Sequence, residues 1–208
     1  MTFHGFSSAD FAVFSNDGLD ERMEAIQNRI QPKFQEIGNE LVDYLQAILG
    51  NEMFLHIAKH ARRTVNPPDD TWLAIANNKR GYKKHPHFQV GLWDDRVFVW
   101  LAYIYELPNK QEMAEVFLDH QHDLEHMLPA DYNISMNHMK KSDDQLRDVE
   151  LNAILERFKN VKSAELLLGK QFAANDPILA DGASFLQEIK SILDVLVPIY
   201  QLSLRTKA

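Results

Sequence analysis

The stretch HFQVGLWDDRVFVWLAYIY, residues 87–105, joins two runs of β-branched and aromatic residues through a pair of aspartates. Runs of this length and composition are typical of strands, and a short polar link between them is typical of a hairpin turn. We therefore predict two antiparallel strands, 87–93 and 96–105, joined by a tight turn at Asp94 and Asp95.

Two similar runs precede the hairpin, MFLHIAKH at 53–60 and TWLAIAN at 71–77. The segments between the runs contain NPPDD and NNKRGYKKHP, which are rich in residues that favour turns and loops. The sequence therefore predicts four antiparallel strands over about residues 53–105.

A long helix is predicted before the sheet, from Leu19 to Ile48. Its large apolar residues recur every three or four positions, on average about every 3.6, which is the period of an α-helix. Pro32 should kink this helix or divide it into two nearly collinear helices without changing the apolar phase. The apolar stripe contains Leu19, Met23, Ile26, Ile30, Phe34, Ile37, Leu41, Leu45 and Ile48.

Three further elements are predicted in the second half of the chain. Asn109, with Glu112 three residues later, is typical of the start of a helix, here over about 110–127. A second helix should cover about 143–159, and SAELLLG at 163–169 is typical of a strand. The first of these helices is expected to bury Met113, Val116, Phe117 and Leu124.

A last helix is predicted to begin after Asp181, whose carboxylate can cap it, with Pro198 disturbing its end. Strands flanked by helices, without alternation of strand and helix, favour an α+β fold. We therefore expect one domain, residues 1–208, with an antiparallel sheet of about five to six strands flanked by helices. The buried face of the last helix should contain Phe185, Ile189, Ile192, Leu196 and Ile199.

The composition excludes several classes of protein. The chain has 208 residues, no cysteine and a formal net charge of -8. Disulfides and thiolate chemistry are therefore excluded, and the average field of the molecule does not attract nucleic acid or anionic lipid. The longest apolar run, VFVWLAYIY at 97–105, is much shorter than the roughly 20 residues of a membrane-spanning helix. We expect a cytoplasmic protein that does not bind membranes.

Positive charge is concentrated in one section of this acidic chain. Residues 59–84 contain seven Lys and Arg against two Asp, a net charge of +5, whereas the rest of the chain carries 15 basic and 28 acidic residues. Arginine suits bidentate recognition of phosphate or carboxylate, and lysine adds point charges. Solvated loop charges are the alternative interpretation.

We hypothesise that this section binds a phosphorylated or carboxylated ligand. Arginines would hold the anion, His60 or His87 could donate or relay a proton, and Thr64 could add a hydroxyl contact. Two alternatives stay open: an RNA-associated or protein-interaction module that uses the same patch, and an enzyme that acts on an acyl or phosphoryl group through a histidine. The candidate ligand-binding residues are Lys59, His60, Arg62, Arg63, Thr64, Arg80, Lys83 and His87.

A single site requires two loops to meet. In a plain meander the segments 56–64 and 78–87 lie at opposite ends of the strand 71–77, which is about 20 Å long. The connection from Arg62 to Asp70 is long enough to fold back over the sheet towards Arg80 and Lys83. We therefore predict one anion site rather than two unrelated charged loops.

Metal and cofactor sites are not predicted. His56 and His60 would stand about 13 Å apart on one strand, too far to chelate an ion. His122 and His126 have a helical spacing that can hold a metal, but they lie on the polar face of their helix and lack a neighbouring zincin glutamate. The chain has no glycine-rich phosphate loop, and Ser135 and Ser142 lie in no nucleophile motif. Trp72, Trp93 and Trp100 are expected to pack on the sheet rather than to stack on bases.

Four blocks of the chain also carry a family resemblance: DFAVF, GLDERMEAIQNRIQPKF, HIAKHARRTVNPPDDTW at 56–72 and NKRGYKKHPHFQVGL at 78–92. With them the chain resembles the YktB-like family of uncharacterised bacterial proteins. The resemblance implies a cytosolic α+β protein whose sheet is related in topology to the catalytic fold of biotin ligases and class II synthetases. It implies no catalytic residues, and an activity inferred from the fold alone would have no physical basis.

Overall fold

A six-stranded antiparallel sheet forms the centre of the molecule in the computed structural model, which describes residues 3–205. The strand order is β1-β2-β3-β4-β6-β5. The predicted α+β class and the predicted run of four antiparallel strands are confirmed, whereas the relation to the biotin ligase topology stays a prediction. The strands are β1 Phe54–Ile57, β2 Asp70–Ala76, β3 His87–Trp93, β4 Arg96–Tyr103, β5 Asn133–Ser135 and β6 Leu166–Ala173.

The hairpin of β3 and β4 lies in the middle of this sheet. Leu92 pairs with Val97, so that Asp94 and Asp95 form the predicted two-residue turn. β6 then pairs with β4 along its whole length, and the short strand β5 pairs with β6 at the edge of the sheet. The sequence analysis missed β5, because a strand of three residues is too short to show a pattern.

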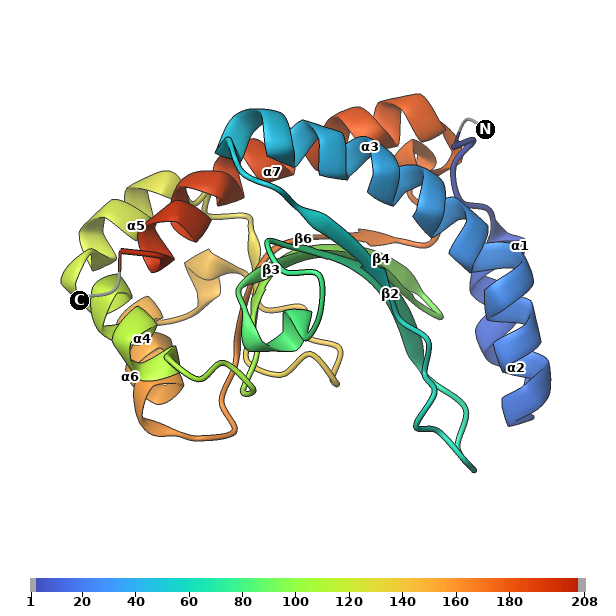
Figure 1. The fold of residues 1–208 in the computed structure, drawn as a ribbon, viewed down its shortest axis with the longest axis horizontal. Coiled ribbons are helices and arrows are strands. Elements are labelled where there is room, and N and C mark those ends of the chain that lie inside the picture. Colours follow the sequence, from blue (N-terminus) through green and yellow to red (C-terminus); the bar gives the residue numbers. More distant parts are fainter. Residues whose placement is uncertain (1–2, 206–208) are drawn as a thin grey trace.

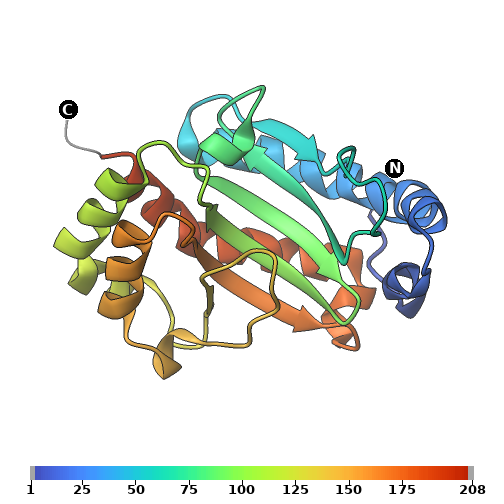
Figure 2. The same ribbon diagram turned by 90° about the horizontal axis from the view of Figure 1, so that it is seen from below.

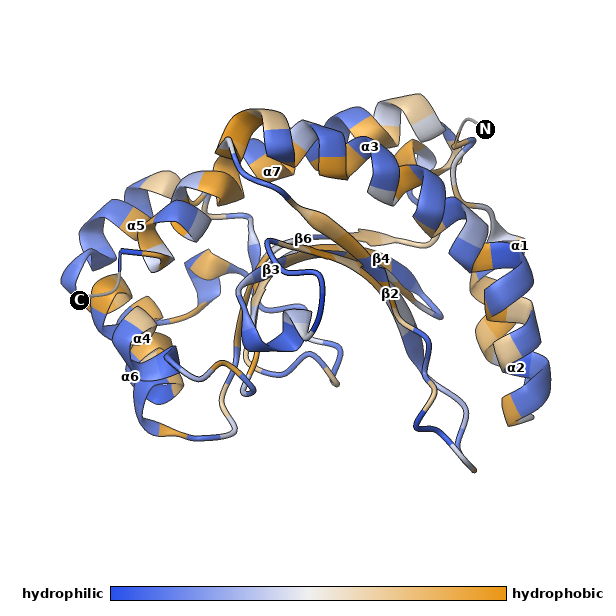
Figure 3. Ribbon diagram, in the orientation of Figure 1, coloured by the Kyte–Doolittle hydropathy of each residue, from blue (hydrophilic) through white to orange (hydrophobic). Residues whose placement is uncertain are grey.

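One face of the sheet is covered by two long helices, α3 Gln31–Leu49 and α7 Gly182–Ser203 (Figure 1). Alternate residues of a strand point to the same face, and here the covered face is formed by leucine, isoleucine, valine and aromatic side chains. Hydrophobic and hydrophilic residues alternate around both helices, as expected when one side packs on a sheet (Figure 3). The remaining α-helices are α1 Ser8–Phe11, α2 Leu19–Ala25, α4 Lys110–Asp119, α5 Gln121–Met127 and α6 Leu151–Asn160.

The predicted helix from Leu19 to Ile48 is confirmed, with a π-helical turn, Ile26–Ile30, between α2 and α3. Pro32 follows this turn directly, at the start of α3. Proline has no N–H to donate and its ring crowds the preceding turn, so a locally wider turn accommodates it. The apolar stripe is buried from Ile26 to Leu45, but Ile48, which was expected in the stripe, is 39% exposed.

Asp181 caps α7 as predicted, because its carboxylate accepts hydrogen bonds from the backbone N–H groups of Ala183 and Ser184. The expected apolar face of α7 is buried, and Pro198 lies within the helix. The predicted helix 110–127 is broken at His120 into α4 and α5, although its four expected core residues are buried. Asn109 precedes α4 but makes no side-chain capping bond.

Two predicted boundaries were wrong. The helix expected over 143–159 begins only at Leu151, because the preceding segment is held at the sheet edge, where Gln145 bridges Asn133 and Arg96 pairs with Asp143. Pairing with the sheet overrides the local helical pattern. The strand expected over 163–169 is β6. It begins at Leu166 and extends to Ala173, because it pairs with β4 as far as Arg96. Within the described residues, no helix is long and apolar enough to cross a membrane.

Candidate functional site

Figure 2 shows the second face of the sheet, with α3 and α7 behind it. Because residues alternate along a strand, Trp72 of β2, Gln89 of β3 and Trp100 of β4 share this face. Trp93 and Trp100 pack with Phe98, Ala102, Ile104 and Leu167, and Trp72 packs against this cluster. The prediction that the three tryptophans pack on the sheet is confirmed.

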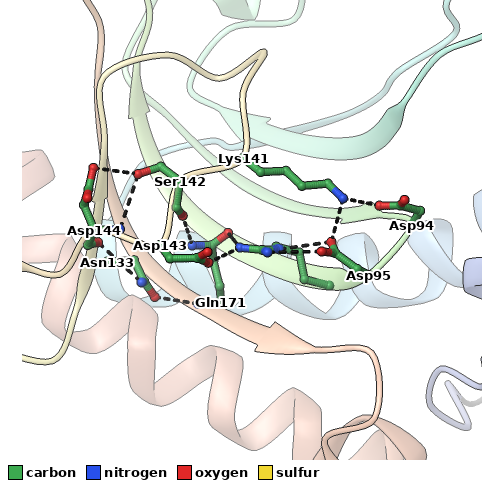
Figure 4. A network of polar contacts seen from close by, with 9 residues as sticks. Asp94, Asp95, Asn133, Lys141, Ser142, Asp143, Asp144 and Gln171 are labelled. Carbon is green, nitrogen blue, oxygen red and sulfur yellow. Dashed lines mark hydrogen bonds and ion pairs between the residues drawn. The ribbon is translucent and has the colours of Figure 1, made fainter.

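A strap, residues 136–145, crosses this face after β5. It is held to the β3–β4 hairpin by ion pairs of Lys141 with Asp94 and Asp95, and by the pair of Arg96 with Asp143 (Figure 4). The side-chain amide of Gln171 also donates to the carbonyl of Ser142 at 2.6 Å. The ion pairs lie at the surface, where such pairs typically contribute less than about 1 kcal/mol each. The end of the strap around Lys141 and Asp143 is therefore held by individually weak contacts.

The strap and the sheet enclose a cavity of about 10 Å³. A space of this size holds about one water molecule. Its walls combine aromatic rings with carboxyl, amide, hydroxyl and imidazole groups. The lining residues are Asp70, Trp72, Gln89, Trp93, Phe98, Trp100, Ser135, Asn137, His138, Lys140, Ser142, Leu167 and Gln171.

His138 enters the cavity from the strap and is held by Glu165, which directly precedes β6. The ring Nδ1 of His138 lies 2.8 Å from both carboxylate oxygens of Glu165, and the backbone N–H of His138 donates to Oε2 at 2.7 Å. Burial alone would raise the pKa of Glu165, but the hydrogen bonds and charge of His138 hold this pKa below its ordinary value. Glu165 is therefore a buried carboxylate in its ionised form.

Asp70, the first residue of β2, is a second buried carboxyl group, with 3% of its surface exposed. Burial raises its pKa to about 6, although His138 and Arg63 act to lower it. Its side chain has no side-chain hydrogen-bond partner within residues 3–205. Asp70 is thus a carboxyl group that gains or loses its proton in a mildly acidic solution.

Trp72 is the point at which the two predicted loops meet. The ring of His60 lies 5.5 Å from the indole in a perpendicular arrangement, and Nζ of Lys83 lies 5.6 Å from it. Trp72 also donates its Nε1–H to the hydroxyl of Tyr82 at 2.9 Å. The β2–β3 connection therefore folds back along β2, whereas the sequence analysis expected the β1–β2 connection to do so.

The two predicted site histidines are both held neutral. Burial, followed by the charges of Arg63 and Lys83, lowers the pKa of His60 to about 4, and its Nε2 lies 3.1 Å from the hydroxyl of Thr71. Burial likewise lowers the pKa of His87 to about 4.

His87 has no exposed surface, and both of its ring nitrogens have partners, the carbonyl of His85 and the side-chain amide of Gln89, each at 2.8 Å. Its ring also lies 5.0 Å from that of Tyr82. His87 therefore supports Tyr82 and Gln89 from behind and has no free nitrogen for a ligand.

The other predicted ligand-binding residues differ in how far they are buried: Arg63 is partly buried, and four others are exposed. Arg63 is half-buried and uses Nη1 to donate to the carbonyls of Asn66 and Pro67. It is near enough to His60 and Asp70 to act on the pKa of each. The remaining four are exposed on the loops, and within residues 3–205 no side-chain hydrogen bond or ion pair joins them to the other candidates: Lys59, Arg62, Thr64 and Arg80.

Sequence reasoning missed Asp70, His138 and Glu165. Asp70 stands in the segment NPPDD, which has the composition of a loop, and His138 and Glu165 are 27 positions apart with no local motif. No serine of the cavity completes a catalytic triad in the described structure: Ser135 donates to the carbonyl of Asn137 and Ser142 to the carboxylate of Asp144.

No group of three or more His, Asp or Glu that could hold a metal ion is found within the part of the chain that the structure describes. The rings of His122 and His126 lie 4.2 Å apart at the surface of α5. Two neighbouring imidazoles without a third ligand are not a closed metal site.

Comparison with known proteins identifies relatives over the whole chain. Residues 6–200 match a family model described as a domain of unknown function, DUF1054. A UPF0637 protein of Shouchella clausii is 54% identical over 208 residues, which cover 100% of this chain and 99% of the relative. A UPF0637 protein of Oceanobacillus iheyensis is 55% identical over 204 residues, 98% of each chain, and one of Listeria monocytogenes is 50% identical over 205 residues, 99% of this chain and 100% of the relative.

Proposed function

The chain belongs to the DUF1054 family of bacterial proteins, and from the geometry of its own sheet face we propose that it binds a small phosphorylated or carboxylated molecule beside Trp72. The observation that carries this proposal is the meeting of basic groups at one indole. Lys83 lies over the ring, His60 lies at its edge, and Arg63 is close enough to act on His60.

The charge of these groups is incompletely neutralised. Nζ of Lys83 lies 4.0 Å from a carboxylate oxygen of Glu106, and both side chains are 36% exposed, so this ion pair is weak. Arg63 uses only Nη1 in hydrogen bonds within residues 3–205, which leaves Nε and Nη2 available for a bidentate contact. An anion would relieve the repulsion among these groups and would be stabilised by them.

The candidate residues take different parts in this proposal. Arg63 and Lys83 hold the anion, His60 contributes a neutral ring nitrogen or an N–H, and His87 keeps Tyr82 and Gln89 in place. The exposed residues of the two loops form an outer ring of positive charge that attracts the ligand without binding it directly. These outer residues are Lys59, Arg62, Thr64 and Arg80, of which Thr64 adds only a hydroxyl.

The alternative of an RNA-associated module is less well supported by this face. Single-stranded nucleic acid stacks its bases on accessible aromatic rings. Trp93 and Trp100 are only 8% and 6% exposed, and Trp72 is partly buried, with His60 and Lys83 beside its ring.

The experiment compares the thermal unfolding of the protein in sulfate, phosphate and chloride at matched ionic strength. Phosphate and sulfate should raise Tm more than chloride does, and Arg63→Ala should abolish most of this difference. Sulfate also stabilises proteins by exclusion from their surface, so Arg157→Ala, at an exposed arginine of α6 outside the candidate residues, is the matched control. If Arg63→Ala responds to the anions as the parent does, the loops carry solvated charges and the proposal is wrong.

A further inference from the structure

The cavity on the second face of the sheet contains a histidine whose orientation is fixed by a buried carboxylate. Glu165 is 2% exposed, and it accepts hydrogen bonds from both the ring and the backbone of His138. Since an ionised carboxylate can only accept, the proton of the neutral ring is placed on Nδ1. The lone pair of Nε2 is then available as a base.

Nε2 of His138 has no hydrogen-bond partner within residues 3–205. The ring lines the cavity, and its plane is inclined at 73° to Trp72 at a distance of 6.5 Å. A base with one nitrogen fixed by a buried carboxylate and the other free has the arrangement of a histidine that activates a nucleophile.

Asp70 lines the same cavity and is close enough to His138 for the two charges to interact. Burial raises the pKa of Asp70 to about 6, so in a mildly acidic solution its carboxyl can donate a proton where His138 accepts one. A carboxyl group and an imidazole that line one cavity can act as a general acid and a general base.

We propose that His138 and Asp70 form a general base and general acid pair that hydrolyses the ester bond of a small anionic carboxylic ester. This activity rests on the proposed anion site, in which Arg63 and Lys83 hold the charged part of the same substrate. Glu165 is a positioning residue, because it acts through His138.

The lining of the cavity favours an acyl rather than a phosphoryl group. Phosphoryl transfer spreads charge over several oxygens and needs several cations or metal ions around them. The cavity has one cationic side chain, Lys140, together with the amides of Gln89 and Asn137. Amide N–H groups suit the single oxyanion that forms when water adds to an ester carbonyl.

In the proposed hydrolysis, His138 and Asp70 account for every proton that is transferred. Nε2 of His138 takes a proton from water as the water oxygen forms a bond with the acyl carbon. The bond between that carbon and the alkoxy oxygen then breaks, and Asp70 gives its proton to the departing alcohol. The proton on His138 returns to the carboxylate of Asp70, so that the net reaction is ester plus water to carboxylic acid plus alcohol.

The cavity must widen to admit a substrate, since its present volume is about 10 Å³. His138 stays bonded to the buried Glu165, whereas the part of the strap around Lys141 and Asp143 is attached through exposed ion pairs (Figure 4). Such pairs open at little cost in free energy. Water would occupy the cavity beside His138, and the ester would enter under the strap from the side of Trp72.

The test measures release of nitrophenol by the full chain from mono-4-nitrophenyl succinate, 4-nitrophenyl acetate and 4-nitrophenyl phosphate. The anionic succinate ester should be hydrolysed fastest and the phosphate should not be hydrolysed. His138→Gln should lower kcat for the nitrophenyl ester by about 100-fold or more. Asp70→Asn should lower kcat by a comparable factor for monomethyl succinate, whose alkoxide leaving group needs a proton, but by less for the nitrophenyl ester. The exposed control His126→Gln should retain the parent rate. A parent protein that is no faster than His138→Gln, or that cleaves only the phosphate, overturns the proposal.

Two further measurements separate the possible failures. Arg63→Ala should raise KM for the succinate ester and leave kcat unchanged. If the anion-dependent rise in Tm is present but no ester is hydrolysed, the anion site stands and the hydrolase is wrong. If the ester is hydrolysed but hydrolysis is insensitive to Arg63→Ala and no anion effect is seen, the hydrolase stands and the proposed anion site is wrong.

The role of Glu165 has a readout that does not depend on activity. Nitrogen NMR of the imidazole rings should show His138 protonated at Nδ1 in the parent protein, and a mixture of tautomers in Glu165→Gln. A parent spectrum with the proton on Nε2 would overturn the assignment of His138 as the base.

Discussion

Replacing Asp70 by Asn should stabilise the folded protein at neutral pH, because the ionised carboxylate is held in a buried position. Its pKa is raised from 3.8 to about 6, and burial is the largest cause. One pKa unit corresponds to about 1.4 kcal/mol, so ionised Asp70 lowers the free energy of unfolding by up to about 3 kcal/mol. An amide of the same shape carries no charge and removes this penalty.

The effect has a defined dependence on pH. Below about pH 4 the carboxyl is protonated in both the folded and the unfolded state, and the penalty is absent. Between about pH 4 and pH 6 the unfolded state loses its proton first, so the penalty grows as the pH rises, and above about pH 6 it is complete. The charged groups that act on Asp70 are His138 and Arg63, which lower its pKa, and Asp69, which raises it.

Urea unfolding at pH 4 and at pH 7 tests this prediction. The difference in unfolding free energy between Asp70→Asn and the parent should be about 2–3 kcal/mol larger at pH 7 than at pH 4. Asp148→Asn is the matched control, because Asp148 is exposed and makes no side-chain hydrogen bond or ion pair within residues 3–205, and it should change stability little at either pH. Equal differences at the two pH values would refute the buried, ionised state of Asp70. A variant that is more stable but hydrolyses no ester would also fit a functional site that is maintained at the expense of stability.

Two other predictions concern the packing of α3 and the strap. Ile37 has no exposed surface, so Ile37→Ala should lower the unfolding free energy by about 2–5 kcal/mol, measured by urea unfolding, and a loss well below about 1 kcal/mol would mean that this face of α3 is not packed. Lys141→Gln removes the ion pairs to Asp94 and Asp95, so hydrogen exchange of the strap amides should become faster while the global stability changes by less than about 1 kcal/mol. Lys159→Gln, which removes the comparable surface pair with Glu115, should leave exchange in the strap unchanged, and equal exchange in the Lys141 variant and the parent would show that these pairs do not hold the strap.

The elements that could be predicted from sequence are those whose pattern is local. The long helix from Leu19, the hairpin at Asp94 and Asp95, and the capped helix after Asp181 each carry their signal within a few turns or a few residues of chain. Their apolar faces follow directly from the period of a helix or a strand. Of the site, the local composition showed the cationic loops and the tryptophans of the sheet, but not which of these side chains meet.

The tertiary structure alone decides which distant residues share a cavity. His138 and Glu165 form their pair across 27 positions, and Lys83 reaches Trp72 because the β2–β3 connection folds back on the strand before it. The segment before α6 has a helical pattern but is held at the sheet edge by Arg96 and Asn133. In each case the local structure is stabilised by contacts with residues that only the fold brings together. Short-range propensity, worth less than about 1 kcal/mol per residue, is too weak to predict such contacts.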